Sequence, residues 1–381
     1  MAADKFSGID INPALYYTEG KSKGYLNLPL IIQNAYKNDC YIIIGVGGRG
    51  TGKTYGMLKM TLDHDWTEII PHSQKKFIYL RRKQKHVAMA NRPMLCPYKK
   101  VNSDTNSSVY CFKIPETDLA AIYHCEHDDE RPDKIYPVGD NIGIMAALST
   151  FYDTRSIDFS DVGIIFYDEF IPEKKEMRMS NEGYTFNNVL ETVNRNREIE
   201  GEPPIMAVCL ANSEKLENAL FMFYGLVKVA MKMRENGQEL LYLKDKGICL
   251  IDMFNSPISK IKGCGFLYNK VNKGNRFAEM SISNKYDIDS AVKTQEKINY
   301  KMYRPIVIIG ELCIYEQKSG DKKYYVSYHK SGNPKRFEIT TLDCERFRKY
   351  YKWLYFLTVA GEVVFEDYSA YVLFIEYINY K

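Results

Sequence analysis

Short runs of apolar residues recur along the first 210 residues, each long enough for one buried strand. These runs are 41–44, 77–80, 162–167 and 205–210. Continuous rather than alternating hydrophobicity is typical of strands that are covered on both faces of a parallel sheet. Segments with helical character lie between them, at 54–62 and 184–198. Strands that alternate with helices predict an α/β fold with a mostly parallel sheet.

Two regions depart from this rhythm. Residues 96–140 are polar, contain prolines and clustered acids, and predict an inserted hairpin with loops. Residues 258–290 are rich in Lys, Gly, Asn and Ser, which is typical of a linker or small hinge module. We therefore expect three parts, 1–257, 258–290 and 291–381.

The last of these parts has its own pattern. Strands are predicted at 306–315 and 323–329, with a lysine-rich turn between them, and an aromatic helix-like run follows at 343–357. About 90 residues of this kind are enough for a small α/β or α+β domain.

Composition narrows the class of protein. Hydrophobic residues make up 45% and charged residues 26% of the chain, as in ordinary globular proteins. No apolar stretch reaches the roughly 18–20 residues of a membrane helix, and we expect no membrane partner. The nine cysteines are scattered singly, which predicts reduced thiols in a cytoplasmic protein. Because the net charge is only +4, any contact with nucleic acid must come from local basic patches.

The strongest chemical signal is the string GGRGTGKT, which fits the phosphate-loop pattern G-x-x-x-x-G-K-[ST]. Glycines let successive backbone N–H groups point at phosphate oxygens, and the following helix presents its positive end to the anion. Lysine adds charge at the β and γ phosphates, and the last hydroxyl ligates magnesium. The sequence therefore predicts a site for ATP and Mg²⁺ formed by Gly47, Gly48, Arg49, Gly50, Thr51, Gly52, Lys53 and Thr54.

A second motif, which is acidic, follows the apolar run 162–167. Asp168 would stand beside the magnesium with Thr54, and Glu169 would orient and deprotonate the attacking water. The alternative is that these acids only cap a buried strand at the surface. Two adjacent acids favour the P-loop ATPases of the additional-strand catalytic-glutamate type. In that type a strand lies between the phosphate-loop strand and the acidic strand, and residues 77–80 could supply it.

Three further polar residues are candidates for contacts with the γ-phosphate. Asn212 follows the run 205–210 by two residues, at the predicted end of the strand, where an amide can sense the γ-phosphate or cap the next helix. Arg195 and Arg197 lie before that run, and a guanidinium supplied by a neighbouring subunit often stabilises phosphoryl transfer. A solvated charged helix end is the alternative for both arginines.

Cations flank the run 77–80 on both sides. One of them could face phosphate, and the rest could contact a DNA backbone, although such charge runs are often only solvated faces. The DNA-binding candidates are Arg81, Arg82, Lys83 and Lys85. The segment 124–127 (His-Cys-Glu-His) invites a zinc interpretation, but no second ligand pair stands at a suitable spacing, and we expect an exposed loop.

Taken in order, the segments GGRGTGKT, FIYLRRK, FYDEF, NRNRE and CLAN resemble the DNA-packaging ATPases of small tailed phages of the phi29 group, relatives of the terminase large subunit. The resemblance is firm from Ile43 to Asn212 and fainter beyond. The chain departs from the family by its greater length around 96–140 and 214–260.

The resemblance implies a motor that drives double-stranded DNA into a viral procapsid at the portal vertex, in the host cytoplasm during phage assembly. It implies a homomeric ring, usually of five subunits, with an RNA adaptor as a further candidate partner. Arg195 falls on the position of a trans-acting arginine finger. The C-terminal part would be a reduced RNase H-like domain that lacks a working metal site and serves for attachment.

Three other functions stay open from sequence. A terminase with an active nuclease would need three or four converging carboxylates. The acids Glu311, Asp321, Asp343, Glu366 and Asp367 do not follow predicted strands in such a pattern. A nucleotide-dependent assembly switch would need only the phosphate loop. A helicase-like ATPase acting on single strands would need further motifs, and we find none.

Overall fold

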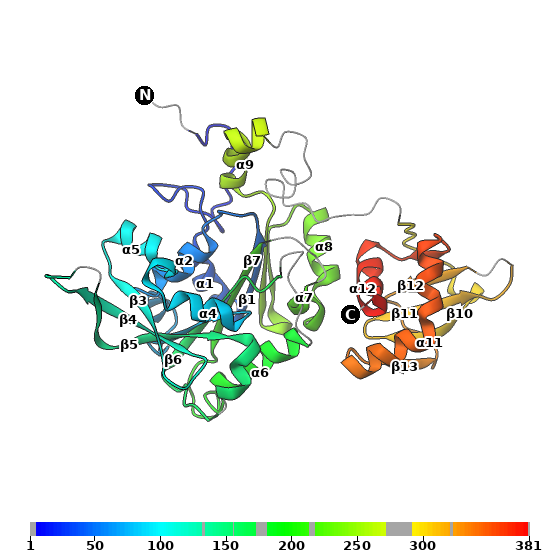
Figure 1. Cartoon of the computed structure of the whole chain (residues 1–381). Coiled ribbons are helices and arrows are strands. Elements are labelled where there is room, and N and C mark those ends of the chain that lie inside the picture. The colour runs from blue at the N-terminus through cyan, green and yellow to red at the C-terminus, as the bar shows by residue number, and fades with distance from the viewer. Residues whose placement is uncertain are drawn as a thin grey trace. The chain divides into compact units, whose positions relative to one another are not determined.

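The computed structural model describes residues 5–131, 134–154, 156–172, 181–212, 218–271, 292–320 and 323–379 (Figure 1). The chain divides into two compact units. The first comprises Met1–Met177, Thr185–Glu214 and Asn236–Lys285, and the second comprises Arg178–Tyr184, Lys215–Glu235 and Tyr286–Lys381. Of the predicted linker, 258–271 belong to the first unit and are largely helical, whereas 272–290 lie outside the described residues.

The first unit is built on a nine-stranded sheet, which confirms the predicted α/β class. Its order is β3-β4-β5-β2-β6-β7-β1-β9-β8, and every pairing from β5 to β9 is parallel. The strands are β1 (Ile42–Gly47), β2 (Lys76–Arg81), β3 (Val109–Lys113), β4 (Ala120–His127), β5 (Ile135–Ala147), β6 (Val162–Asp168), β7 (Met206–Asn212), β8 (Leu240–Leu243) and β9 (Ile248–Met253). The apolar runs of the sequence are thus the central strands.

One predicted neighbour relation is wrong. The strand between β1 and β6 is β7, and β2 lies on the other side of β6, so residues 77–80 do not supply the intervening strand. Both β2 and β7 are apolar runs buried on both faces. Such runs carry no signal for their order in a sheet.

The region 96–140 contains the predicted hairpin, but it is continuous with the main sheet. Strands β3, β4 and β5 form an antiparallel extension, and the second half of β5 pairs in parallel with β2. The segment 124–127 is part of β4 rather than a loop. Among the described residues there is no group of three His, Cys, Asp or Glu side chains that could hold a metal ion.

Helices flank this sheet (Figure 1). They are α1 (Leu28–Lys37), α2 (Lys53–Met60), α3 (Trp66–Ile69), α4 (Gln84–Ala90), α5 (Lys99–Thr105), α6 (Glu182–Asn194) and α9 (Pro257–Gly263). The core beneath them is aromatic at its centre, where Trp66 packs edge-on against Phe77 and Phe166. In the described part of the chain, no helix has the length and apolarity that crossing a membrane requires.

The second unit has a five-stranded sheet of order β13-β10-β11-β12-β14. The single strand predicted at 306–315 is a hairpin that turns at Gly310, where φ is +52°. The strands are β10 (Tyr303–Ile309), β11 (Leu312–Gln317), β12 (Tyr324–Ser327), β13 (Lys335–Phe337) and β14 (Val363–Phe365). The helices are α7 (Ala219–Phe223), α8 (Val227–Glu235), α11 (Thr341–Val359) and α12 (Tyr368–Asn379).

Candidate functional site

The loop between β1 and α2 has the geometry that its glycines permit. Gly50 and Gly52 have φ of +79° and +94°, in the left-handed region that other residues rarely adopt. Gly52 is the N-cap of α2, so the loop runs directly into the helix N-terminus. On the sheet, Gly47 lies opposite Asn212 of β7 on one side and Met253 of β9 on the other. Asn212 is therefore beside the start of the loop.

The side chain of Lys53 folds back onto the same loop. Its Nζ donates to the carbonyl oxygens of Gly47 (3.1 Å) and Gly48 (2.6 Å) and to Thr51 Oγ1 (3.2 Å). Burial lowers the pKa of Lys53 to about 8, although the carboxylates of Asp168 and Glu169 act to raise it. A phosphate anion would favour the charged ammonium at this position.

The acidic strand and the phosphate loop meet at Asp168. The Thr54 hydroxyl donates to Asp168 Oδ2 at 2.9 Å, across 114 residues of sequence. Asp168 is 1% exposed, and the same oxygen accepts from Tyr79 Oη at 2.7 Å and Arg81 Nη1 at 2.9 Å. The hydroxyl and the carboxylate predicted to hold Mg²⁺ are thus in direct contact. Hydroxyl and carboxylate oxygens are hard ligands that suit this ion.

Glu169 leaves the strand in an unusual conformation. Its φ is +55°, and its backbone N–H still donates to the Leu210 carbonyl on β7 at 2.9 Å. Its side chain is 51% exposed and forms an ion pair with Arg81. Arg81 therefore bridges both acids and fixes the direction of the Glu169 carboxylate.

The two candidate arginines behave differently. Arg197 is buried, and its guanidinium donates to the carbonyl oxygens of Phe159, Ser160 and Val162 at the start of β6. Burial lowers the pKa of Arg197, and its part in the fold is to satisfy these carbonyls.

Arg195 is held more loosely. It is 45% exposed, its Nη2 donates to the Ile157 carbonyl at 2.6 Å, and its Nη1 is 3.7 Å from Asp158. These partners precede the first residue of β6, whereas Asp168 ends that strand. A seven-residue strand is about 20 Å long. Arg195 therefore lies near the N-terminal end of β6, whereas the phosphate loop lies at the C-terminal ends of the parallel strands.

The basic stretch after β2 is divided in the same way. Arg81 faces the acids, and Arg82 is 1% exposed, so neither presents a guanidinium on an open surface. The DNA contact predicted for these two is not supported by their positions. Lys83 precedes α4, and Lys85 is exposed within α4. Both follow the C-terminal end of β2, the end of the sheet at which the phosphate loop also lies. DNA contact by these two stays a prediction.

Two contacts of the site escaped the sequence analysis. Tyr79 could have been suspected, because Tyr79 and Arg81 stand two apart on one strand and so point to the same face. Lys262 lies on α9 in the predicted linker, and its Nζ donates to the Arg49 carbonyl at 2.6 Å. No local pattern marks that lysine.

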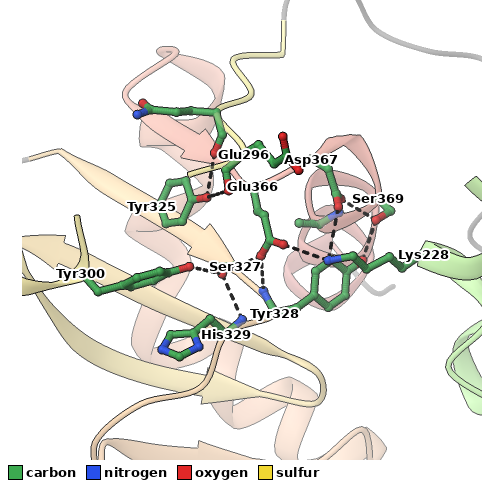
Figure 2. A network of polar contacts seen from close by, with 12 residues as sticks. Lys228, Glu296, Tyr300, Tyr325, Ser327, Tyr328, His329, Glu366, Asp367 and Ser369 are labelled. Atoms are coloured by element: carbon green, nitrogen blue, oxygen red, sulfur yellow. Dashed lines mark hydrogen bonds and ion pairs between the residues drawn. The ribbon is translucent and has the colours of Figure 1, made fainter. Parts of the chain in front are cut away.

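A second acidic pair lies in the second unit (Figure 2). Glu366 and Asp367 follow β14 directly, a short strand that the sequence pattern did not predict. Lys228 of α8 donates to Glu366 at 2.8 Å and is 3.6 Å from Asp367. Ser327 Oγ at the end of β12 donates to Glu366 at 2.6 Å. Asp321 lies outside the described residues.

Comparison with known proteins fits this geometry. The sequence profile of the Podovirus DNA encapsidation protein (Gp16) family matches residues 128–317. The chain belongs to this family. The matched span includes Asp168, Glu169, Arg195 and Asn212.

Curated relatives of this encapsidation family member are called DNA packaging proteins. That of Bacillus phage phi29 is 26% identical over 254 residues, which cover 66% of this chain and 64% of the relative. That of Bacillus phage B103 is 28% identical over 274 residues and 70% of each chain. The chain thus spans less than two thirds of the phi29 protein it matches.

Solved structures share the fold. The Phi-28 gp11 DNA packaging motor aligns with a TM-score of 0.57 and 17% identity over 91% of this chain and 96% of that one. The phi29 viral genome packaging motor assembly aligns with a TM-score of 0.54 and 19% identity over 91% and 98%. At sequence identities this low, the structural likeness shows only that this chain shares their fold.

Proposed function

We propose that this chain is an ATP-hydrolysing motor that translocates double-stranded viral DNA into a procapsid. The observation that carries the proposal is the contact between Thr54 of the phosphate loop and Asp168 of the acidic strand. The family and the relatives are named for DNA encapsidation and DNA packaging, which supports DNA as the substrate. The portal and the procapsid are the partners that we propose.

The residues of the site have distinct roles in this proposal. The loop from Gly47 to Gly52 and the N-terminus of α2 bind the phosphates, and Lys53 adds charge at their β and γ positions. Thr54 and Asp168 hold Mg²⁺, which when bound neutralises charge on the phosphates. Asn212 stands beside Gly47, where its amide can respond to the terminal phosphate.

Glu169 is the proposed general base. Its carboxylate is half exposed, follows the buried Asp168, and is oriented by Arg81. A carboxylate with one oxygen held and the other available can orient a water molecule and take its proton. Tyr79 and Arg81 are positioning residues, because they act through the two acids.

Arg195 is the proposed trans-acting finger. Arg195 lies at the N-terminal end of β6, and its own phosphate loop lies at the C-terminal ends of the strands. Its guanidinium can therefore contact only a nucleotide bound to another subunit. This arrangement requires another copy of the chain. We propose a ring of five copies, with an RNA adaptor as a candidate partner. In such a ring each subunit hydrolyses its ATP when the neighbouring subunit supplies the arginine.

The other parts of the chain are assigned by the same proposal. Lys83 and Lys85 contact the DNA backbone from the edge that carries the phosphate loop. The second unit is a reduced RNase H-like domain used for attachment to the motor base. In its described residues three acids do not converge, which supports attachment over nuclease activity.

The proposal is tested by steady-state ATP hydrolysis with and without double-stranded DNA. We expect multiple turnovers stimulated by DNA, which a nucleotide-dependent switch would not show. Lys53→Ala should abolish nucleotide binding or turnover. No stimulation by DNA in the assembled packaging complex would reject the motor.

Action of Arg195 in trans is tested by mixing variants. Arg195→Ala and Glu169→Gln subunits are each expected to be inactive alone. Mixed rings place an intact Arg195 beside an intact Glu169, so partial recovery of hydrolysis is expected. If the mixtures stay inactive, Arg195 does not act across subunits.

A further inference from the structure

Lys262 approaches the phosphate loop from the side opposite the acids. Its helix α9 begins four residues after β9, and β9 pairs with β1 so that Met253 lies opposite Gly47. Ser256 caps α9, with its hydroxyl accepting from the Ser259 N–H at 3.4 Å. The start of the helix is therefore fixed beside the start of the loop.

The contact is close. Lys262 Nζ is 2.6 Å from the Arg49 carbonyl, and it would be 2.6 Å from a Cβ placed on Gly50. A Cβ on Gly47 would come within 2.7 Å of Met253. At Gly47 the loop is thus packed tightly against β9, and at Gly50 the nearest atom is the ammonium nitrogen at the end of the flexible Lys262 side chain.

Three cations lie at this short loop, two from the loop and the start of α2 and one from α9. Lys53, Arg49 and Lys262 lie near enough that Lys262 and Arg49 both act to lower the pKa of Lys53. Burial and then Arg49 lower the pKa of Lys262 as well. Like charges this close repel one another, and a polyphosphate anion is the ligand that would turn the repulsion into attraction.

Resting on the function proposed above, we propose that Lys262 is a second phosphate-contacting lysine of this site. Its ammonium donates to the terminal phosphate of a bound nucleoside triphosphate. The ammonium group has three N–H donors on a flexible stem, so it can hold a loop carbonyl and a phosphate oxygen together. Lys53 reaches the β and γ phosphates from the same loop, and Lys262 is its neighbour there.

The competing role is a structural one, in which Lys262 only supports the loop through the Arg49 carbonyl. Lys262→Gln separates the two, because glutamine keeps an N–H donor for that carbonyl and loses the charge. Lys260→Gln is the matched control, since Lys260 is exposed on the same helix. The readouts are the dissociation constants of a non-hydrolysable ATP analogue and of ADP, and the melting temperature without nucleotide.

We expect Lys262→Gln to weaken the triphosphate analogue about tenfold or more and ADP less than about twofold, because charged hydrogen bonds to the terminal phosphate are lost. Lys262→Arg should keep most of the preference for the triphosphate. The control and the melting temperature should not change. Equal weakening of both nucleotides, or none, would overturn the proposal, and equal weakening with a lower melting temperature would identify a structural support.

The unmodified protein offers a second measurement that needs no variant. Acetylation of lysines can be followed by mass spectrometry, with the triphosphate analogue or ADP present. The analogue should protect Lys262 more strongly than ADP does, while Lys260 is modified equally in both. Equal modification of Lys262 would overturn the proposal.

The same data separate this inference from the proposed function. If the unmodified protein binds both nucleotides and Lys53→Ala binds neither, the nucleotide site stands whatever Lys262 does. If the unmodified protein binds no nucleotide, the proposed function and the role of Lys262 fail together.

Discussion

Two places in this chain repeat one arrangement, in different units. In the first unit the adjacent acids Asp168 and Glu169 leave the end of β6, and Arg81 bridges them. In the second unit Glu366 and Asp367 leave the end of β14, and Lys228 lies against both. Each cation is also paired with a tyrosine, through the Tyr79 hydroxyl in one and the ring of Tyr328 in the other.

What lies in front of each pair is different. Asp168 faces Thr54 at the N-terminus of a helix, where the glycine loop and Lys53 offer positive charge to an anion. Glu366 is satisfied by Lys228, the Ser327 hydroxyl and the Tyr328 backbone N–H. In the second unit the carboxylate of Glu366 is hydrogen-bonded to these groups of the protein itself, and the contact with Lys228 holds α8 to the sheet (Figure 2). An acidic pair at a strand end therefore becomes a candidate active site only where an anion-binding loop faces it.

The largest expected difference between the two pairs is in catalysis. Glu169→Gln should lower DNA-stimulated ATP turnover by about 10²–10⁴-fold, because a general base is lost. Nucleotide affinity should change little. The matched variant Glu366→Gln should leave turnover within about twofold. Similar losses in both variants would remove the distinction between the two clusters.

The second difference is in stability. Lys228→Met leaves two carboxylates without their cation, and the free energy of opening of the second unit should fall by about 2 kcal/mol, since the site is only partly buried. Hydrogen exchange of the β12 and α12 amides measures this change. Lys232→Met, one turn along α8 and exposed, should change it by less than about 0.5 kcal/mol. Equal effects of the two variants would show that the ion pair is not stabilising.

The third expected difference is a pH dependence confined to the first site. The pKa of Lys53 is lowered to about 8, and bound phosphates would raise it. Nucleotide affinity should then be highest below pH 8 and fall about tenfold per unit above it, until the pKa of the complex is reached. Titration calorimetry in two buffers of different ionisation enthalpy should detect uptake of up to one proton. No uptake between pH 8 and 9 would contradict this.

The smallest effect is expected for Ser327→Ala. The hydroxyl is buried, donates to Glu366, and accepts from the His329 N–H at 3.0 Å. Its loss should lower the opening free energy of the second unit by about 1 kcal/mol and leave turnover unchanged. Hydrogen exchange measures the first quantity and steady-state hydrolysis the second. A change in turnover would link the second network to catalysis.

The sequence predicts the local parts of this structure well. The phosphate loop, the acidic strand and the central strands follow from patterns within about ten residues, and the pairing of Thr54 with Asp168 follows from the chemistry that both motifs share. The order of the strands does not follow, because equally apolar runs can occupy any central position. That is why residues 77–80 were predicted to supply the strand between the phosphate-loop strand and the acidic strand, a place that β7 occupies.

The remaining contacts depend on residues far apart in the chain. Lys262 meets Arg49 across 213 residues, and Lys228 meets Glu366 across 138. Strand β14 has only three residues, too short for a periodic signal, so Glu366 was not placed at a strand end. The contact proposed for Arg195 is with another copy of the chain, so within one copy only its distance from its own phosphate loop bears on it.

The central claim is that the first acidic pair, and not the second, handles the nucleotide. It is tested most directly by a structure of the protein with a non-hydrolysable ATP analogue and Mn²⁺, with the metal located by its anomalous scattering. We predict one metal beside Thr54 and Asp168, with the triphosphate in the loop from Gly47 to Gly52. A metal bound by Glu366 and Asp367, or a phosphate loop without nucleotide, would contradict the account.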